Sequence, residues 1–182
     1  MGRVTHRDTQ MMMAYLLSQR ENVAKYWVTV TAGQTHTIYS LGITAGKSAV
    51  VTWGDGLSNE YTGTATRTHV YASAGTYEVK IYTPENVIAF DLRDAKVSVL
   101  NSADLKTMAS INNITIVGLT SASITLNSAD WVDWRVSGTF YLYNLTNASI
   151  TLNSADMVDW RPGGSFYLQN LLNASITLNS AD

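Results

Sequence analysis

The stretch Leu100-Asn-Ser-Ala-Asp104 decides the fold, because the same five residues recur at a fixed distance along the chain. Copies stand at 126–130, 152–156 and 178–182, each beginning 26 residues after the one before it. A second motif, Ala-Ser-Ile-Thr, directly precedes the last three copies. Regular self-similarity at a period of about 20 to 50 residues is typical of stacked-repeat proteins. The sequence therefore predicts a repeat region, which we place at residues 84–182.

Two short strands are expected in each repeat, because apolar and polar residues alternate there. Phe140 and Leu142 alternate with Tyr141 and Tyr143, and a second alternation surrounds Ile150. If repeats stack as parallel strands, equivalent residues lie above one another. The expected inward rows are Ile114/Phe140/Phe166, Ile116/Leu142/Leu168, Leu119/Leu145/Leu171 and Ile124/Ile150/Ile176. We also expect a ladder of amides that bond to each other and to corner backbone groups, formed by Asn101, Asn127, Asn153 and Asn179.

This region resembles a leucine-rich-repeat-like solenoid, and in particular the short Leu/Asn-rich repeats of phage and bacterial surface proteins. The usual leucine-rich spacing is met only in part, since Ala148 takes a leucine position between Leu145 and Ile150. The two-stranded coils of a β-helix are therefore an open alternative. The last copy of the motif ends the sequence without a polar capping unit, so we expect further repeats or another chain to cover that end.

Composition excludes several classes of function. Charged residues make up only 14% of the 182 residues, against roughly 25% in typical soluble domains. A net charge of −2 offers no electrostatic attraction to nucleic acid or an anionic membrane. No apolar run approaches the roughly 18 residues that span a bilayer, so no membrane insertion is expected. The chain has no cysteine, which excludes disulfides and thiolate chemistry.

Residues 1–26 predict a helix, which Asp8 or Thr9 can cap. Its largely apolar side follows helical spacing at Met12, Tyr15, Leu16, Gln19, Val23 and Tyr26. No small-residue cleavage site follows the short apolar run, which argues against a secretion signal. A helix outside a globular domain needs a cover for its apolar face. We therefore expect it either to pack on the next domain or to attach the chain to a partner.

Residues 27–83 carry period-two alternation and two blocks of turn and aromatic residues. The blocks are Trp53-Gly-Asp-Gly56 and a later stretch that contains His69-Val-Tyr71 and Gly75-Thr-Tyr77. These blocks resemble the polycystic-kidney-disease (PKD) type of immunoglobulin-like domain. The resemblance implies a β-sandwich that serves as a spacer or interaction module. Its structural motif residues would be Trp53, Asp55, Gly56, His69, Tyr71, Gly75 and Tyr77.

Asp55 and His69 invite an acid–base or metal interpretation. A structural pair is favoured, because no third ligand or nucleophile accompanies them in the sequence. Stacked acidic residues in the repeats suggest Ca²⁺, but only one or two carboxylates stand in each repeat and no Gly-rich motif accompanies them. We therefore expect no metal and no cofactor. The acidic residues of these rows are Asp130, Asp133, Asp156 and Asp159.

Aromatic residues of the repeats are the candidate ligand-binding set. If exposed beside Asn and Asp, they would form a sugar-binding strip. The candidates are Tyr141, Tyr143, Tyr167, Trp131, Trp134 and Trp160. For the tryptophans, filling the irregular side of each repeat is the favoured interpretation. The tyrosines alternate outward and keep the binding interpretation.

The sequence has no nucleophile–base–acid set, phosphate loop or metal cluster, so an enzyme is the least expected class. The fold class expected is mainly β: an N-terminal helix, a PKD/Ig-like sandwich and a repeat β-solenoid. The leading hypothesis is a tail-fibre or appendage protein of a tailed phage, located in the virion. It would contact other virion proteins through its N-terminal helix, form a homo-oligomer, and present its repeats to a host-surface glycan or protein. The alternatives are a secreted bacterial cell-surface adhesin and a ligand-free filament or capsid-decoration subunit.

Overall fold

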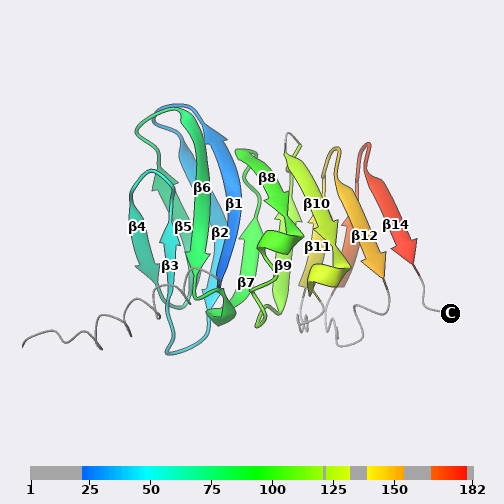
Figure 1. Ribbon diagram of the computed structural model, residues 1–182, viewed down its shortest axis with the longest axis horizontal. Helices are drawn as coiled ribbons and strands as arrows, with labels where there is room; N and C mark the ends of the chain where they lie inside the picture. The colour runs from blue at the N-terminus through cyan, green and yellow to red at the C-terminus, as the bar shows by residue number, and fades with distance from the viewer. Residues whose placement is uncertain (1–21, 121, 132–138, 154–164, 180–182) are drawn as a thin grey trace, which may run out of the picture.

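The protein is described by a computed structural model over residues 22–120, 122–131, 139–153 and 165–179 (Figure 1). These residues form two β-sheets and three short 3₁₀ helices, so the expectation of a mainly β fold is confirmed. Within this part of the chain no helix is long and apolar enough to cross a membrane.

The larger sheet has eight strands in the order β14-β12-β10-β8-β1-β6-β3-β4. Its antiparallel part pairs β1 with β6, β6 with β3 and β3 with β4, whereas β8, β10, β12 and β14 run parallel. The strands are β1 (Val23–Val30), β3 (Ala49–Thr52), β4 (Ser58–Tyr61), β6 (Gly75–Tyr82), β8 (Val97–Asn101), β10 (Ser123–Asn127), β12 (Ser149–Asn153) and β14 (Ser175–Asn179).

The smaller sheet has six strands in the order β13-β11-β9-β7-β2-β5. Strand β2 pairs antiparallel with β5 and β7, and β7, β9, β11 and β13 are parallel. The strands are β2 (Thr35–Ile43), β5 (Thr64–Val70), β7 (Val87–Leu92), β9 (Asn113–Val117), β11 (Thr139–Tyr143) and β13 (Ser165–Gln169). The 3₁₀ helices are η1 (Pro84–Asn86), η2 (Ser102–Asp104) and η3 (Ser128–Trp131).

The start of β1 corrects the helix expected over residues 1–26. Val23 and Tyr26 belong to β1, where Ala24, Tyr26 and Val28 are buried and the residues between them are not. The spacing of these residues also fits a helix, but pairing with β6 and β8 makes the segment a strand. As a strand, it buries every second side chain in the core. The remainder of the expected helix, residues 1–21, lies outside the described residues.

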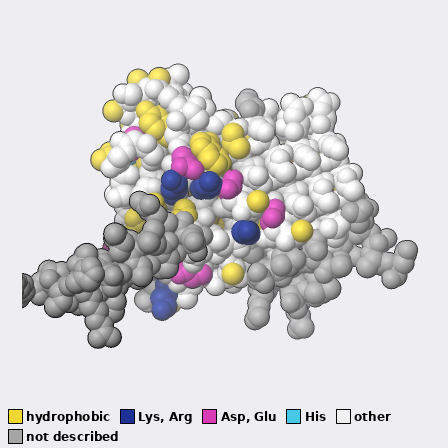
Figure 2. Space-filling model, viewed as in Figure 1, with side chains coloured by type: hydrophobic (Ala, Val, Ile, Leu, Met, Phe, Trp, Pro, Cys, Tyr) yellow, Lys and Arg dark blue, Asp and Glu magenta, His cyan; other side chains and the backbone are white. Residues whose placement is uncertain are grey.

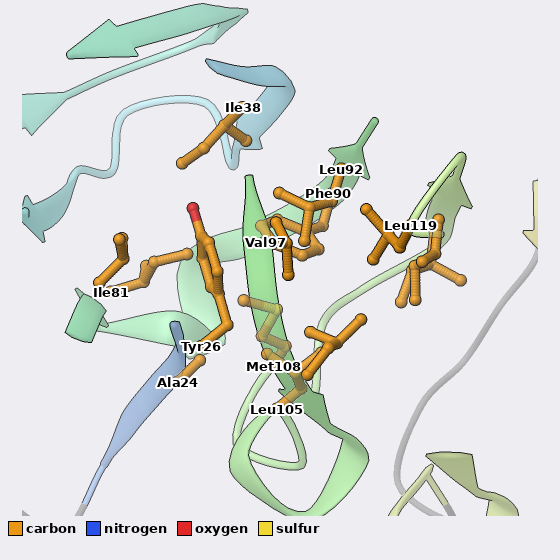
Figure 3. Close-up of a cluster of buried hydrophobic side chains, with 14 of the residues drawn as sticks. Ala24, Tyr26, Ile38, Ile81, Phe90, Leu92, Val97, Leu105, Met108 and Leu119 are labelled. Atoms are coloured by element: carbon orange, nitrogen blue, oxygen red, sulfur yellow. The ribbon is translucent and has the colours of Figure 1, made fainter. Parts of the chain in front are cut away.

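Both sheets continue from the antiparallel strands into the repeats. η1 lies at the boundary expected near residue 84, yet β1 pairs directly with β8 and β2 pairs directly with β7. One buried cluster accordingly joins Tyr26 and Ile81 to Phe90, Val97 and Leu119 (Figure 3). The first repeat strands thus complete the core of the antiparallel part.

In the smaller sheet the repeats align at their full period. Phe140 lies opposite Ile114 on one side and Phe166 on the other, and Leu142 likewise lies between Ile116 and Leu168. The side chains of Ile114, Phe140 and Leu142 are fully buried. These two expected rows are therefore present in the register of the strands.

In the larger sheet, the pairing of β10 with its two neighbours differs from the expected register by two residues. Ile150 lies opposite Ile176 as expected, but opposite Leu126 rather than Ile124, and Ile124 lies opposite Leu100. The expected row Ile124/Ile150/Ile176 is therefore wrong at Ile124. A shift by two residues keeps every side chain on its own face of the sheet, so the core is preserved.

The Leu-Asn-Ser-Ala-Asp motif makes the corners and links successive repeats. Oδ1 of Asn101 accepts a hydrogen bond from the Ala103 backbone N–H, and Oδ1 of Asn127 accepts one from the Ala129 backbone N–H. The expected bonds to corner backbone are thus confirmed for these two amides. A serine of the motif links successive repeats: the buried Ser102 Oγ accepts from the Asn127 N–H at 2.8 Å and donates to Asp130 at 2.5 Å.

We expect Ser102→Ala to lower the free energy of unfolding by about 2 kcal/mol, because it leaves the Asn127 N–H and the Asp130 carboxylate without this partner. Denaturant unfolding followed by circular dichroism measures the change. Ser149→Ala is the control, since Ser149 is exposed on β12 and its replacement should cost less than about 0.5 kcal/mol. Equal effects of the two variants would contradict the serine link.

Candidate ligand-binding face

Three tyrosines gather on the outer surface of the six-stranded sheet. Because Phe140 and Leu142 point into the core, Tyr141 and Tyr143 on the same strand point outward. Their rings stack with centroids 5.7 Å apart and planes 5° apart. The Tyr167 ring, which is half exposed, meets Tyr141 edge-on at 5.2 Å. The sequence thus placed these three side chains on one surface, as expected from their alternation.

The tryptophans do not extend this surface within the described residues. Trp131 is 1% exposed and packs edge-on against Phe140 with ring centroids 5.5 Å apart. Trp131 is therefore not a ligand-binding residue, because η3 turns its ring into the core. This position agrees with the favoured interpretation that the tryptophans fill the irregular side of each repeat. Trp134 and Trp160 lie outside the described residues.

An ion pair that the sequence analysis missed lies beside the tyrosines. Asp91 points outward from β7 between the buried Phe90 and Leu92, and Arg93 is the first residue after this strand. The guanidinium donates from Nε to Oδ1 at 2.7 Å and from Nη2 to Oδ2 at 2.6 Å. These hydrogen bonds raise the pKa of Arg93 against the effect of burial, with smaller contributions from Tyr39 and Tyr141. The outward position of Asp91 in an alternating strand was the signal that could have revealed it.

We call the outward side chains of Asp91, Arg93, Tyr141, Tyr143 and Tyr167 the tyrosine face. Two shallow depressions adjoin on it. One, of about 470 Å³, is bordered by the ion pair and Tyr141, and the other, of about 440 Å³, lies between Tyr141 and Tyr167. Thr139 and Tyr141 border both, so the two depressions adjoin, and we call them together the groove. Aromatic rings beside convergent polar groups are the usual make-up of a ligand site.

A third depression, of about 550 Å³, lies on the outer side of the eight-stranded sheet. Figure 2 shows basic and acidic side chains gathered over the middle of this side. Lys25 lies 3.5 Å from Glu78 and 3.7 Å from Asp104, and Lys80 lies 2.8 Å from Glu78. Ion pairs of this kind at the surface are solvated and add little to binding or stability. We therefore assign no ligand to this depression.

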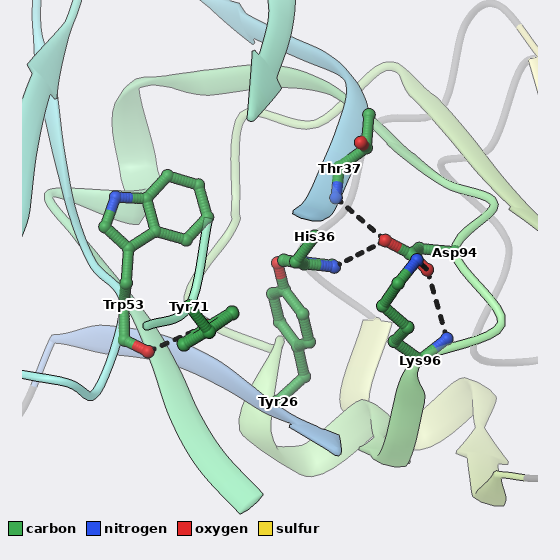
Figure 4. Close-up of polar contacts among 7 residues, drawn as sticks. All are labelled: Tyr26, His36, Thr37, Trp53, Tyr71, Asp94 and Lys96. Atoms are coloured by element: carbon green, nitrogen blue, oxygen red, sulfur yellow. Dashed lines mark hydrogen bonds and ion pairs between the residues drawn. The ribbon is translucent and has the colours of Figure 1, made fainter. Parts of the chain in front are cut away.

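A deeply buried polar network joins the two sheets (Figure 4). The Tyr26 hydroxyl lies 2.8 Å from His36 Nε2, and His36 Nδ1 lies 2.9 Å from Asp94 Oδ2. Asp94 also accepts from the Thr37 N–H and from both nitrogens of Lys96. Burial alone would raise the pKa of Asp94, but these hydrogen bonds outweigh it and hold the pKa well below its usual range.

This network resembles a catalytic triad in its residue types only. Tyr26 and His36 have no exposed surface, so a substrate cannot reach either side chain. Burial, the largest effect on Tyr26, raises the pKa of its hydroxyl, which keeps it protonated. We interpret the network as structural, joining β1 and β2 to the loop before β8.

The residues of the two turn and aromatic blocks form a second structural cluster. His69 Nε2 lies 2.7 Å from Asp55 Oδ2, which is the pair expected from sequence, and the His69 ring stacks on Trp53 at 4.9 Å. The Tyr71 hydroxyl donates to the Trp53 carbonyl at 2.9 Å, and the Tyr71 and Tyr77 rings stack at 4.4 Å.

The glycines and the carboxylate of this cluster shape its backbone, at the turn before β4 and at the start of β6. Gly56 has a φ of 93°, and the Cβ of any residue at Gly75 would lie 3.2 Å from the Tyr77 ring. Burial would raise the pKa of Asp55, but hydrogen bonds from His69 and the Leu57 N–H lower it. Across the described part of the chain, no three His, Asp or Glu side chains come together as metal ligands.

No protein-family profile, curated protein or solved structure matches this chain.

Proposed function

We propose that this chain is a non-enzymatic virion structural protein of a tailed phage, a fibre or appendage component that binds the host surface. The tyrosine face carries this proposal: Tyr141 and Tyr167 border a groove on the sheet, and the ring of Tyr141 contacts the rings of both Tyr143 and Tyr167. Aromatic side chains held rigidly in this way supply contact area at low cost in conformational entropy. In this view the N-terminal segment attaches the chain to other virion proteins, and the virion is its location.

The architecture supports a role in an elongated particle. We infer that the antiparallel strands are a PKD-like sandwich and that the parallel strands are coils of a repeat solenoid. The two share continuous sheets and one core. Such a rod holds its outer face at a defined distance from its attachment point, and repeats lengthen it without changing that face. A homo-oligomer, as is common for fibres, would multiply weak contacts with the host through avidity.

Replacing Tyr141, Tyr143 and Tyr167 together by Ser should remove most of the binding of the fluorescently labelled chain to host cells. Truncating a few central aromatic residues commonly removes the larger part of a binding energy. Flow cytometry measures the bound protein. Tyr82→Ser is the matched control, because Tyr82 is a partly buried tyrosine on β6 of the other sheet. Unchanged binding by the triple variant would contradict the host-binding role.

Location is tested separately, by immunogold electron microscopy with antibodies against the purified chain. Gold particles on an appendage of the virion are the expected result. Labelling confined to the surface of uninfected bacteria would replace the virion proposal by the adhesin alternative. Labelling of virions together with unchanged host binding by the triple variant would favour the ligand-free structural subunit.

A further inference from the structure

We propose that the tyrosine face binds a neutral linear glycan that runs across the strands, from Tyr167 on β13 to Asp91 on β7. This inference rests on the host-binding function proposed above and names the ligand of the same face. It adds Asp91 and Arg93 to the binding residues.

The register of the sheet provides the direction of the ligand. Tyr167, Tyr141, Thr115, Asp91 and Ser40 are opposite one another on adjacent strands, and none is fully buried. Neighbouring strands lie about 4.8 Å apart, so the stretch from Tyr167 to Asp91 extends over roughly 14 Å. The groove follows this row, because its two depressions meet at Tyr141. A ligand in the groove is therefore extended and longer than one or two sugar units.

The side chains along the row match the two surfaces of a sugar ring. Tyr141 and Tyr167 offer aromatic faces on which the C–H face of a pyranose can pack. At the other end, the Asp91 carboxylate accepts hydrogen bonds from hydroxyl groups. Arg93 carries five N–H donors, of which Asp91 engages only part. One end of the groove thus packs against sugar rings while the other end binds their hydroxyls.

Charge selects a neutral glycan over an anionic one. Asp91 and Arg93 balance each other, and the remaining side chains that border the groove are uncharged, with hydroxyl and amide groups such as those of Thr115, Thr139 and Gln169. An acidic polymer would find no unbalanced cation here and would be repelled by the Asp91 carboxylate. A hydroxyl-rich neutral chain can instead satisfy both members of the ion pair without separating them.

The test uses the full chain on an array of immobilised linear oligosaccharides, from mono- to octasaccharides, in neutral and carboxylated series. We expect binding only in the neutral series, rising with length and levelling off once the row is filled. Asp91→Asn should weaken that binding about tenfold or more, since a hydrogen bond to a charged group is lost. Tyr82→Ser should leave it unchanged. Equal unfolding midpoints for the variants and the wild type show that the fold is intact.

Three results would overturn this inference. These are preference for the carboxylated series, binding of a monosaccharide as strong as that of a hexasaccharide, and unchanged binding by Asp91→Asn. If the array stays empty while the triple tyrosine variant still loses binding to host cells, the glycan is the wrong ligand class and the host-binding function stands. If the triple variant binds cells normally, the proposed function itself fails.

Discussion

Asp94→Asn is expected to lower the free energy of unfolding by about 3 kcal/mol at neutral pH, as for removal of one member of a buried charged pair. The carboxylate is 5% exposed and bonds to His36, the Thr37 N–H and two nitrogens of Lys96. An amide keeps the shape of the side chain but loses the charge that strengthens these bonds. Urea unfolding of both proteins measures the difference.

The same variant should change how stability depends on pH. The pKa of Asp94 is lowered in the folded protein, so its ionisation stabilises the fold fully above the unfolded-state pKa of about 3.9. That contribution is lost as the pH falls below about 4 toward the folded-state value. The difference between wild type and Asp94→Asn should therefore be constant from pH 7 to about pH 5 and shrink in more acidic solution.

Asp104→Asn is the control, because Asp104 forms a partly exposed ion pair with Lys25 at 3.7 Å. Its replacement should cost less than about 1 kcal/mol. A loss at Asp94 no larger than the loss at Asp104, or a difference that does not depend on acid, would show that the buried network adds little to stability.

The repeat period and the alternation within it predicted most of the parallel part of the fold. Alternation determines which side chains point inward, and it correctly placed Phe140 and Leu142 in the core and Tyr141 at the surface. The period correctly aligned β11 with β13. It could not give the two-residue shift between β10 and β12, because such a shift leaves every side chain on the same face.

Interactions between distant segments were beyond the reach of local pattern. Val23–Tyr26 fits a helix and a strand equally well by spacing, and only its pairing with β6 makes it a strand. Ser102 looks like an ordinary corner residue until Asn127 and Asp130 are placed beside it. Asp94 belongs to no sequence motif, because its partner His36 lies on the distant strand β2. Arg93 also belongs to none, because only the fold places it near Tyr141.

The turn after Trp53 provides the second large expected effect. Gly54→Ala should lower the free energy of unfolding by about 3 to 4 kcal/mol. Gly54 has a φ of 86°, and a Cβ there would lie 2.8 Å from the Glu78 carbonyl oxygen and 2.9 Å from its nitrogen. Both are backbone atoms of β6, so neither can rotate away, and the turn must move off the sheet. Trp53, His69 and the core beneath them would move with it.

Gly56→Ala separates the two causes in the same turn. Gly56 also has a positive φ, of 93°, but a Cβ there meets no atom within 4 Å. Its replacement should cost only the conformational strain, about 1 to 2 kcal/mol. The difference between the two variants, measured by denaturant unfolding under identical conditions, is the cost of the contact with β6. If Gly56→Ala proves as damaging as Gly54→Ala, backbone conformation alone determines this turn, and close packing against Glu78 contributes nothing.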